Sequence, residues 1–204
     1  MLFEEIKITF TSFKKDNIST ERKQVLEPLI DYIQSKVNEG KNINLNFICT
    51  HNSRRSHLSQ VWAQAAAHYH QVKNVHCYSG GTEATALFSM AAQTLENAGF
   101  QIIKLSNEEN PVYSIKFAEN EHPIIGFSKT YDHVLNPKSE FAAIMTCSHA
   151  DKNCPFIPGC EKRIPVRYND PKEFDNTTQQ VEKYKERSNQ IAVEMNYVFS
   201  QIKK

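Results

Sequence analysis

The chain has 204 residues, enough for one well-buried domain with or without an appended segment. Its 24 Lys and Arg residues nearly balance its 23 Asp and Glu residues, so the formal charge of +1 creates no overall field for nucleic acid or for an anionic membrane. No stretch approaches the ~18 consecutive apolar residues of a membrane span, and the first residues lack the basic start and apolar run of a secretory signal. We therefore expect a cytoplasmic protein with neither a nucleic-acid nor a membrane partner.

The cysteine count also limits the possible class of protein. Five cysteines are an odd number in a chain too long to need disulfide crosslinks. In a reducing compartment these residues are thiols, some of which can be reactive, and Cys77 is expected to be a small buried residue.

The N-terminal part of the chain predicts a helix. Apolar residues between positions 20 and 37 fall on one helical stripe, and the stretch 38–42 has the composition of a stop signal. Because Pro28 lies inside this stripe, the helix either begins near that residue or bends there. We expect residues 1–40 to form an N-terminal helical extension to a main domain of residues 41–204.

Strands and helices then alternate along the main domain. Apolar runs predict strands, 3.6-residue periodicity predicts helices, and two alternating runs predict a β-hairpin inserted at about residues 110–134. The expected strands are residues 43–48, 75–79, 141–146 and 164–168, and the expected helices are 55–70, 83–97 and 178–202. This alternation predicts a parallel sheet, whose active sites lie beyond the carboxyl ends of its strands. Cys49, Ser79 and Cys147 all stand at such ends.

The loop after the first strand has the features of an anion site. A loop that leads into a helix N-terminus exposes unpaired backbone N–H groups, and the helix dipole adds positive potential there. This field favours the thiolate form of Cys49, which can attack a bound tetrahedral oxyanion. The planar fork of Arg55 can hold two oxygens. The predicted oxyanion-binding residues are Thr50, His51, Asn52, Ser53, Arg54, Arg55 and Ser56. The alternative is that Cys49 is a core residue and that the arginines are solvated.

The Cys-x5-Arg-Ser pattern of this loop resembles the signature of the low-molecular-weight protein tyrosine phosphatases. It is equally similar to the signature of the thioredoxin-coupled arsenate reductases, which share their fold. Residues 78–84 (YSGGTEA) resemble the Ser-Ala-Gly-Thr segment that follows the second strand in both groups. The resemblance implies a three-layer α/β fold with a four-stranded parallel sheet and Cys49 as the nucleophile. His51 departs from the pattern, since the family usually has Gly at that position.

Cys147 and Cys154 resemble the paired cysteines that distinguish the reductases. The segment 145–155 (MTCSHADKNCP) places both thiols around an Ala-Asp pair and before a proline, as in those enzymes. The resemblance implies that Cys147 attacks Cys49 and expels arsenite, and that Cys154 then forms a disulfide with Cys147 for thioredoxin to reduce. An alternative is a zinc site at Cys147, Cys154, Cys160 and His149, although the spacing lacks a CxxC knuckle.

Asp170 lies in a stretch, Tyr168 to Pro171, that is similar to the Asp-Pro element carrying the general acid in this family. A carboxyl group there would protonate the leaving oxygen, and the same stretch is also typical of a turn. Lys172 follows Pro171 where phosphatases have an aromatic residue, which argues mildly against a tyrosine phosphatase.

These features predict an arsenate reductase with no bound cofactor and with thioredoxin as its external reductant. The first alternative is a low-molecular-weight phosphatase that uses only Cys49, Arg55 and Asp170. The second is a non-catalytic regulator that binds an oxyanion or a metal ion on the same fold.

Overall fold

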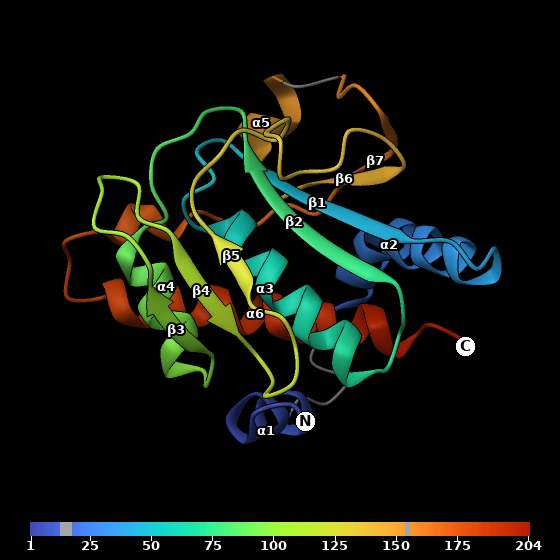
Figure 1. The fold of residues 1–204 in the computed structure, drawn as a ribbon, viewed down its shortest axis with the longest axis horizontal. Coiled ribbons are helices and arrows are strands. Elements are labelled where there is room, and N and C mark those ends of the chain that lie inside the picture. The colour runs from blue at the N-terminus through green and yellow to red at the C-terminus, as the bar shows by residue number, and fades with distance from the viewer. Residues whose placement is uncertain (13–17, 154–155) are drawn as a thin grey trace.

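The protein contains a parallel four-stranded sheet and a smaller antiparallel sheet, in a computed structural model that describes residues 1–12, 18–153 and 156–204. The larger sheet has the strand order β2-β1-β6-β7 (Figure 1). Its strands are β1 (Ile43–Cys49), β2 (Val75–Gly81), β6 (Phe141–Met145) and β7 (Cys160–Pro165). The predicted α/β class and four-stranded parallel sheet are therefore confirmed.

The two central strands form the middle of the core. All residues of β6 are buried, as are all but one of β1, because helices and loops cover both faces of a parallel sheet. Strand β1 pairs with β2 and with β6 along its length, so that Ile48 lies opposite both Gly80 and Met145. This register brings the carboxyl ends of all three strands to one edge of the sheet.

The helices cover this sheet and pack against one another. Their bounds are α1 (Glu4–Ser12), α2 (Thr20–Asn38), α3 (Arg55–Tyr69), α4 (Ser89–Asn97), α5 (Ser148–Asn153) and α6 (Gln180–Ser200), with a short 3-10 helix η2 (Pro171–Phe174). Helix α6 packs along α3 and also contacts α1, α2 and α4. Buried Trp62 of α3 anchors this contact, since its indole N–H donates to Ser188 Oγ of α6 at 2.8 Å.

The N-terminal helices pack onto the main sheet and α6. Helix α2 begins at Thr20, where Ser19 Oγ accepts the Arg22 N–H at 3.2 Å, and it continues through Pro28. It contacts β1, β7 and α6, so its apolar stripe is buried in the same core as the sheet. That residues 1–40 form an appended unit stays a prediction.

The inserted hairpin is present and has a third strand. Strands β4 (Tyr113–Lys116) and β5 (Ile124–Gly126) pair antiparallel within the predicted insertion. Strand β3 (Gln101–Lys104) pairs antiparallel with β4, which completes a sheet of order β3-β4-β5. The alternating pattern predicted the hairpin, but β3 was missed because its four residues are mostly exposed or half-buried and lack a clear alternation.

Two predicted boundaries were wrong. The helix expected over residues 83–97 begins only at Ser89, because the preceding residues bond to the loop after β1 instead of forming helical turns. The fourth strand, expected over residues 164–168, is assigned to Cys160–Pro165. The backbone beyond it still bonds to the end of β6 and the residue after it, with Val166 N donating to Met145 O and Tyr168 N to Thr146 O, both at 3.0 Å.

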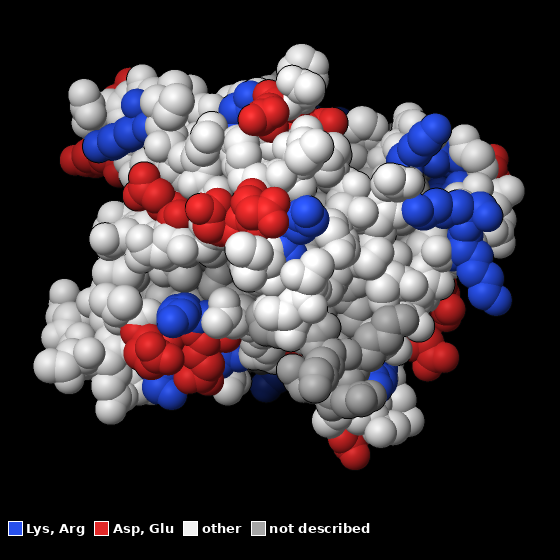
Figure 2. All heavy atoms as spheres, turned by 90° about the horizontal axis from the view of Figure 1, so that it is seen from below, with Lys and Arg blue, Asp and Glu red and all other residues white. Residues whose placement is uncertain are grey.

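The surface carries charges of both signs. On the face that Figure 2 shows, acidic and basic side chains form small groups, several of which contain both signs, and neither sign covers the face. Within the described residues, every helix is too short or too polar to cross a membrane.

Candidate active site

The loop between β1 and α3 is held by backbone hydrogen bonds from the segment after β2. Thr82 N donates to Cys49 O at 3.1 Å, and Glu83 N donates to Thr50 O at 2.8 Å. Gly81 allows this approach, because a Cβ atom there would lie 2.2 Å from Glu83 O and 2.7 Å from Thr50 O. This contact gives a physical reason for the small residues of the 78–84 motif. The motif is a support for the loop.

Asn52 holds the loop in its turn. Its φ of 44° lies in the left-handed region, which Asn tolerates better than most residues. The side-chain amide donates to Ser56 Oγ at 2.8 Å, and Asn52 Oδ1 accepts the Lys129 N–H at 3.0 Å. Since Ser56 Oγ accepts from Asn52, its own hydrogen is available to the Cys49 sulfur, 3.1 Å away. The buried sulfur of Cys49 therefore lies within hydrogen-bond distance of the Ser56 hydroxyl.

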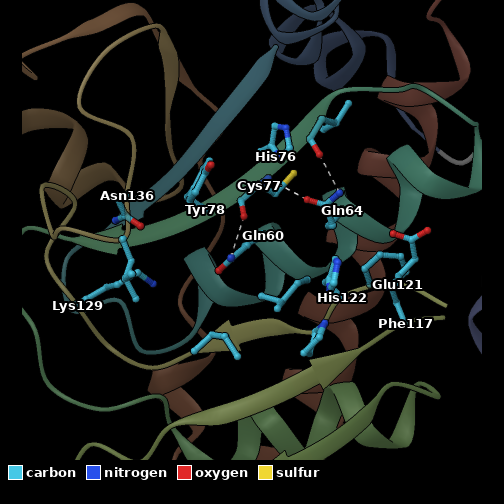
Figure 3. A pocket seen from close by; sticks show the side chains of 15 residues that line it. Gln60, Gln64, His76, Cys77, Tyr78, Phe117, Glu121, His122, Lys129 and Asn136 are labelled. Atoms are coloured by element: carbon cyan, nitrogen blue, oxygen red, sulfur yellow. Dashed lines mark hydrogen bonds between the residues drawn. The ribbon is translucent and has the colours of Figure 1, made fainter. Parts of the chain in front are cut away.

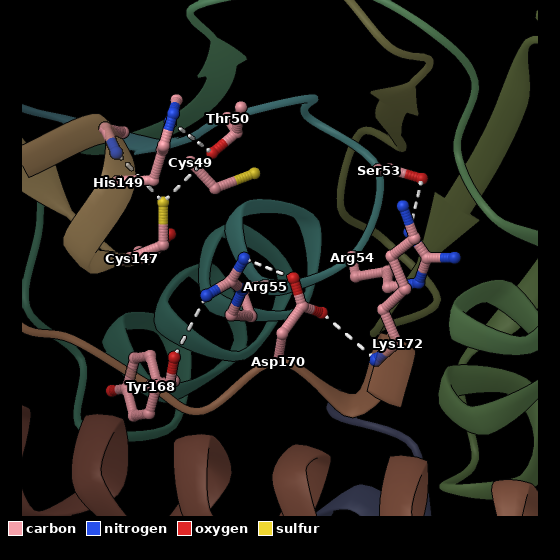
Figure 4. Close-up of polar contacts among 12 residues, drawn as sticks. Cys49, Thr50, Ser53, Arg54, Arg55, Cys147, His149, Tyr168, Asp170 and Lys172 are labelled. Carbon is pink, nitrogen blue, oxygen red and sulfur yellow. Dashed lines mark hydrogen bonds and ion pairs between the residues drawn. The ribbon is translucent and has the colours of Figure 1, made fainter. Parts of the chain in front are cut away.

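Arg55 lies at the first turn of α3, and Asp170 fixes the direction of its guanidinium (Figure 4). Arg55 Nη2 pairs with Asp170 Oδ2, and Nη1 donates to Tyr168 O at 3.1 Å. The Nε–H is buried and has no hydrogen-bond partner among the described residues. A donor of this kind beside the loop suits an oxyanion, because an unsatisfied buried donor is costly.

Asp170 is the residue that precedes η2. Its Oδ1 accepts the Lys172 N–H at 3.1 Å, which caps the short helix, while Oδ2 faces Arg55. The two sequence interpretations of this stretch, a turn and a functional carboxylate, are therefore compatible. The structure brings Asp170 and Arg55 together across 115 residues of chain.

The side chains of Arg54 and His51 have partners of their own. The Arg54 guanidinium lies over the Phe88 ring and bonds to Tyr184 Oη and to Asp175 Oδ2, at 2.6 Å for the latter. Burial, and then the Asp175 carboxylate, raises the pKa of Tyr184, whose hydroxyl donates to that carboxylate. His51 Nε2 lies 3.7 Å from Glu83 Oε2. That Arg54, His51 and the other residues of the loop bind an oxyanion stays a prediction.

Cys147 lies directly beside this loop. Its sulfur is 3.4 Å from Thr50 Oγ1 and accepts the Ala150 N–H at 3.3 Å. Thr50 Oγ1 is also 3.3 Å from His149 Nδ1, so this hydroxyl stands between the thiol and the imidazole (Figure 4). Cys49 and Cys147 belong to one buried apolar cluster.

Cys154, the third cysteine of the predicted relay, lies outside the described residues. Within the part of the chain that the structure describes, no three His, Cys, Asp or Glu side chains converge in a manner suited to a metal ion.

A segment that the sequence analysis assigned to the hairpin also supports the loop. Strand β5 ends at Gly126, and Ser128 Oγ then donates to His51 O at 2.8 Å. Lys129, next along the chain, is buried and lines a pocket of about 470 Å³ that is also lined by residues of α3, β2 and β5 (Figure 3). Burial lowers the pKa of Lys129 to about 8. Residues 127–131 carry no local motif, so only the tertiary contacts identify them.

Two further buried groups have structural roles. Burial, and then the nearby Lys129 charge, lowers the pKa of His57 to about 3, so its imidazole is neutral at physiological pH. Burial also raises the pKa of the Cys77 thiol, which agrees with the interpretation of Cys77 as a small core residue.

Comparison with known proteins relates the chain to arsenate reductases and to low-molecular-weight phosphatases. No family model matches the chain. Arsenate reductase 2 of Staphylococcus epidermidis is 28% identical over 125 residues, which are 61% of this chain and 76% of that protein. A solved arsenate reductase in the phosphate binding state aligns with a TM-score of 0.51 at 16% identity, over 79% of this chain and 99% of the other.

A low-molecular-weight phosphotyrosine phosphatase of Vibrio cholerae has the same fold, with a TM-score of 0.50 at 13% identity, over 78% of this chain and 95% of the other. The two structural likenesses show a shared fold, and the staphylococcal relative adds a distant likeness in sequence. The chain therefore has the fold that these low-molecular-weight phosphatase and arsenate reductase structures share, and arsenate reductases are among its distant relatives in sequence.

Proposed function

We propose that this protein reduces arsenate to arsenite at Cys49. The observation that carries the proposal is the position of Cys147, a second buried thiol that lies 3.4 Å from the hydroxyl of the residue after Cys49. Hydrolysis of a phosphate ester needs one thiol, whereas reduction of arsenate by thiols needs a second sulfur that forms a disulfide with the first. The distant arsenate reductase relatives support the same choice.

Binding of the oxyanion uses Arg55 and the N–H groups of the loop. The unpartnered Nε–H of Arg55 offers one donor, and an arriving oxyanion competes with Asp170 for a second. The arsenate that displaces Asp170 from Arg55 carries a hydroxyl proton that it can pass to the freed carboxylate. The Cys49 thiolate then attacks arsenic, an As–O bond breaks, and the departing hydroxyl takes that proton from the Asp170 carboxyl group and leaves as water. The product of this step is a Cys49 adduct of arsenic(V).

Reduction occurs when Cys147 attacks the sulfur of Cys49. A disulfide forms between the two residues and the S–As bond breaks, so its electron pair passes to arsenic and arsenite leaves as arsenic(III). Cys154 then attacks Cys147, Cys49 departs as a thiolate, and the Cys147–Cys154 disulfide takes two electrons from the dithiol of thioredoxin. The roles of Cys154 and thioredoxin rest on the resemblance of the 145–155 segment to arsenate reductases.

A phosphomonoesterase is the second candidate, because Cys49, Arg55 and Asp170 already form a complete set for that reaction. In that case Cys49 takes the phosphoryl group and Asp170 protonates the leaving alcohol. Lys172 follows Pro171 where a phosphotyrosine ring would need an aromatic neighbour. This substitution makes a phosphotyrosine substrate the weaker choice.

The test is arsenate-dependent oxidation of NADPH in the presence of thioredoxin and thioredoxin reductase, with hydrolysis of an aryl phosphate measured in parallel. We expect turnover of arsenate in the wild type. We expect Cys147→Ser to lose it while retaining any hydrolysis of the ester.

The matched control is Cys160→Ser, which removes a partly exposed thiol of the same region and should keep both activities. Equal arsenate turnover in Cys147→Ser would refute the relay. Ester hydrolysis without arsenate turnover in the wild type would favour the phosphatase, and the absence of both would favour a non-catalytic regulator.

A further inference from the structure

We propose that His149 receives the proton of the Cys147 thiol through the hydroxyl of Thr50. The inference rests on the proposed reduction of arsenate, because only that reaction requires Cys147 as a nucleophile. It assigns His149 as a positioning residue for the second thiol, a role that neither the loop motif nor the paired cysteines require.

The three groups form a continuous chain of contacts. Thr50 Oγ1 lies 3.4 Å from Cys147 Sγ and 3.3 Å from His149 Nδ1, distances within reach of a hydrogen bond involving sulfur and of a long N···O bond. A hydroxyl has one hydrogen to donate and two lone pairs that accept, so Thr50 can bond to both neighbours at once.

Proton transfer along this chain is balanced. Before transfer, the Cys147 S–H donates to Thr50 Oγ1, whose own hydrogen points to the unprotonated Nδ1 of His149. As the thiol proton moves to the hydroxyl oxygen, the hydroxyl proton moves to Nδ1. The hydrogen bonds then run in the opposite direction, from the imidazolium to Thr50 and from Thr50 to the thiolate, with the total charge unchanged.

Burial explains why Cys147 needs a relay. Its side chain is 1% exposed, so water cannot take its proton directly, whereas His149 lies on the exposed side of α5. The imidazole can therefore exchange its proton with solvent. The Ala150 N–H, 3.3 Å from Cys147 Sγ, remains to stabilise the thiolate.

The neighbouring charges already have partners. On the same helix, the Asp151 carboxylate is paired with Arg163 and Arg167, which come from β7 and the segment after it. Across the loop, Arg55 is paired with Asp170. The remaining ionisable groups of the cluster are the thiols of Cys49 on β1 and Cys160 on β7, and the phenol of Tyr131, which packs against it. Among the described residues, the Cys147 sulfur contacts the Thr50 hydroxyl, and that hydroxyl contacts a basic group, the imidazole of His149.

The test measures ionisation of Cys147 directly, in the full chain and without arsenate. Protein labelled with ¹³C at the cysteine Cβ atoms is titrated with base by NMR, and Cys147→Ser identifies the resonance. We expect His149→Asn, which keeps a hydrogen-bond acceptor but cannot take a proton, to move the Cys147 midpoint up by ~1 pH unit, about tenfold in thiolate at neutral pH.

Thr50 variants test the middle of the relay. Thr50→Val should move the midpoint as far as His149→Asn does, and Thr50→Ser should restore the wild-type midpoint. His76→Asn, a substitution of an exposed histidine on β2, is the matched control and should have no effect.

A wild-type midpoint in His149→Asn would overturn the inference, because a merely structural acceptor is replaced by Asn. The same holds if Thr50→Val titrates normally. If His149→Asn fails to give a folded spectrum, His149→Gln replaces it, under the same criterion. The measurement needs no turnover, so it separates this inference from the proposed function. If the protein fails the arsenate assay but His149→Asn still shifts the Cys147 midpoint, the proton relay is supported and the proposed reductase activity is refuted.

Discussion

Replacement of Arg55 by Lys is expected to abolish most of the activity at Cys49 without unfolding the protein. The guanidinium of Arg55 is fixed by Tyr168 O and Asp170 and still has a buried Nε–H with no partner among the described residues. Lysine keeps the positive charge but has a single nitrogen, which cannot reach an oxyanion and both of these acceptors in the same geometry.

The size of the effect follows from the hydrogen bonds that are lost. A charge-assisted hydrogen bond contributes about 1.5–3 kcal/mol, and the substitution removes one or two of them from the bound oxyanion. A loss of about 1.5–6 kcal/mol in transition-state stabilisation corresponds to a decrease in kcat/KM of about tenfold to 10,000-fold.

The assay is kcat/KM for arsenate, together with phosphate binding to the resting enzyme by calorimetry. Arg54→Lys is the matched control, since the Arg54 guanidinium bonds to Tyr184 and Asp175 instead of Asp170. We expect Arg54→Lys to lower thermal stability and to lower kcat/KM less than Arg55→Lys does. An Arg55→Lys enzyme within threefold of the wild type, or a larger loss in Arg54→Lys, would show that the assignment of the two arginines is mistaken.

Two further predictions concern the support of the loop. Gly81→Ala should destabilise the protein by about 1–3 kcal/mol and weaken phosphate binding, because the added methyl group meets backbone atoms on both sides. Thermal melting measures the first effect and calorimetry the second. An unchanged phosphate affinity would count against the role of Gly81 in supporting the loop. The pKa of Lys129 is lowered to about 8 in the fold, so the unfolded chain binds more protons between about pH 8 and pH 10.4, and this group's contribution to stability rises with pH over that window. Urea unfolding should therefore show the stability advantage of Lys129→Met over wild type shrinking from pH 8 to pH 10, and a constant difference would contradict the buried charge.

Local patterns carried the prediction of the main sheet and of the anion loop. The strand before Cys49 and the helix after Arg55 follow from apolar runs and helical periodicity, which depend on neighbouring residues alone. The same is true of α2, α6 and the β4-β5 hairpin, whose patterns extend over many residues. The boundaries failed where a segment bonds to something distant in sequence, as residues 83–88 do to the loop.

The sequence by itself determined which residues have the chemistry of the site. Cys49, Arg55, Cys147 and Asp170 were selected by residue type, by position at strand ends and by resemblance to a family. Those choices depend on the order of the residues and on the reactivity of each side chain, and both are known from the amino-acid sequence without a structure.

Only the tertiary structure decided which of these residues contact one another. The pairing of Arg55 with Asp170, the opposite direction of Arg54, and the contact of Thr50 with both Cys147 and His149 join segments about 100 residues apart or more. Residues 127–131, including Lys129, were likewise identified only by their tertiary contacts, because they carry no sequence motif. Such contacts are set by the register of three parallel strands and by the packing of loops at their carboxyl ends. They arise from the packing of the whole core, which no local pattern encodes.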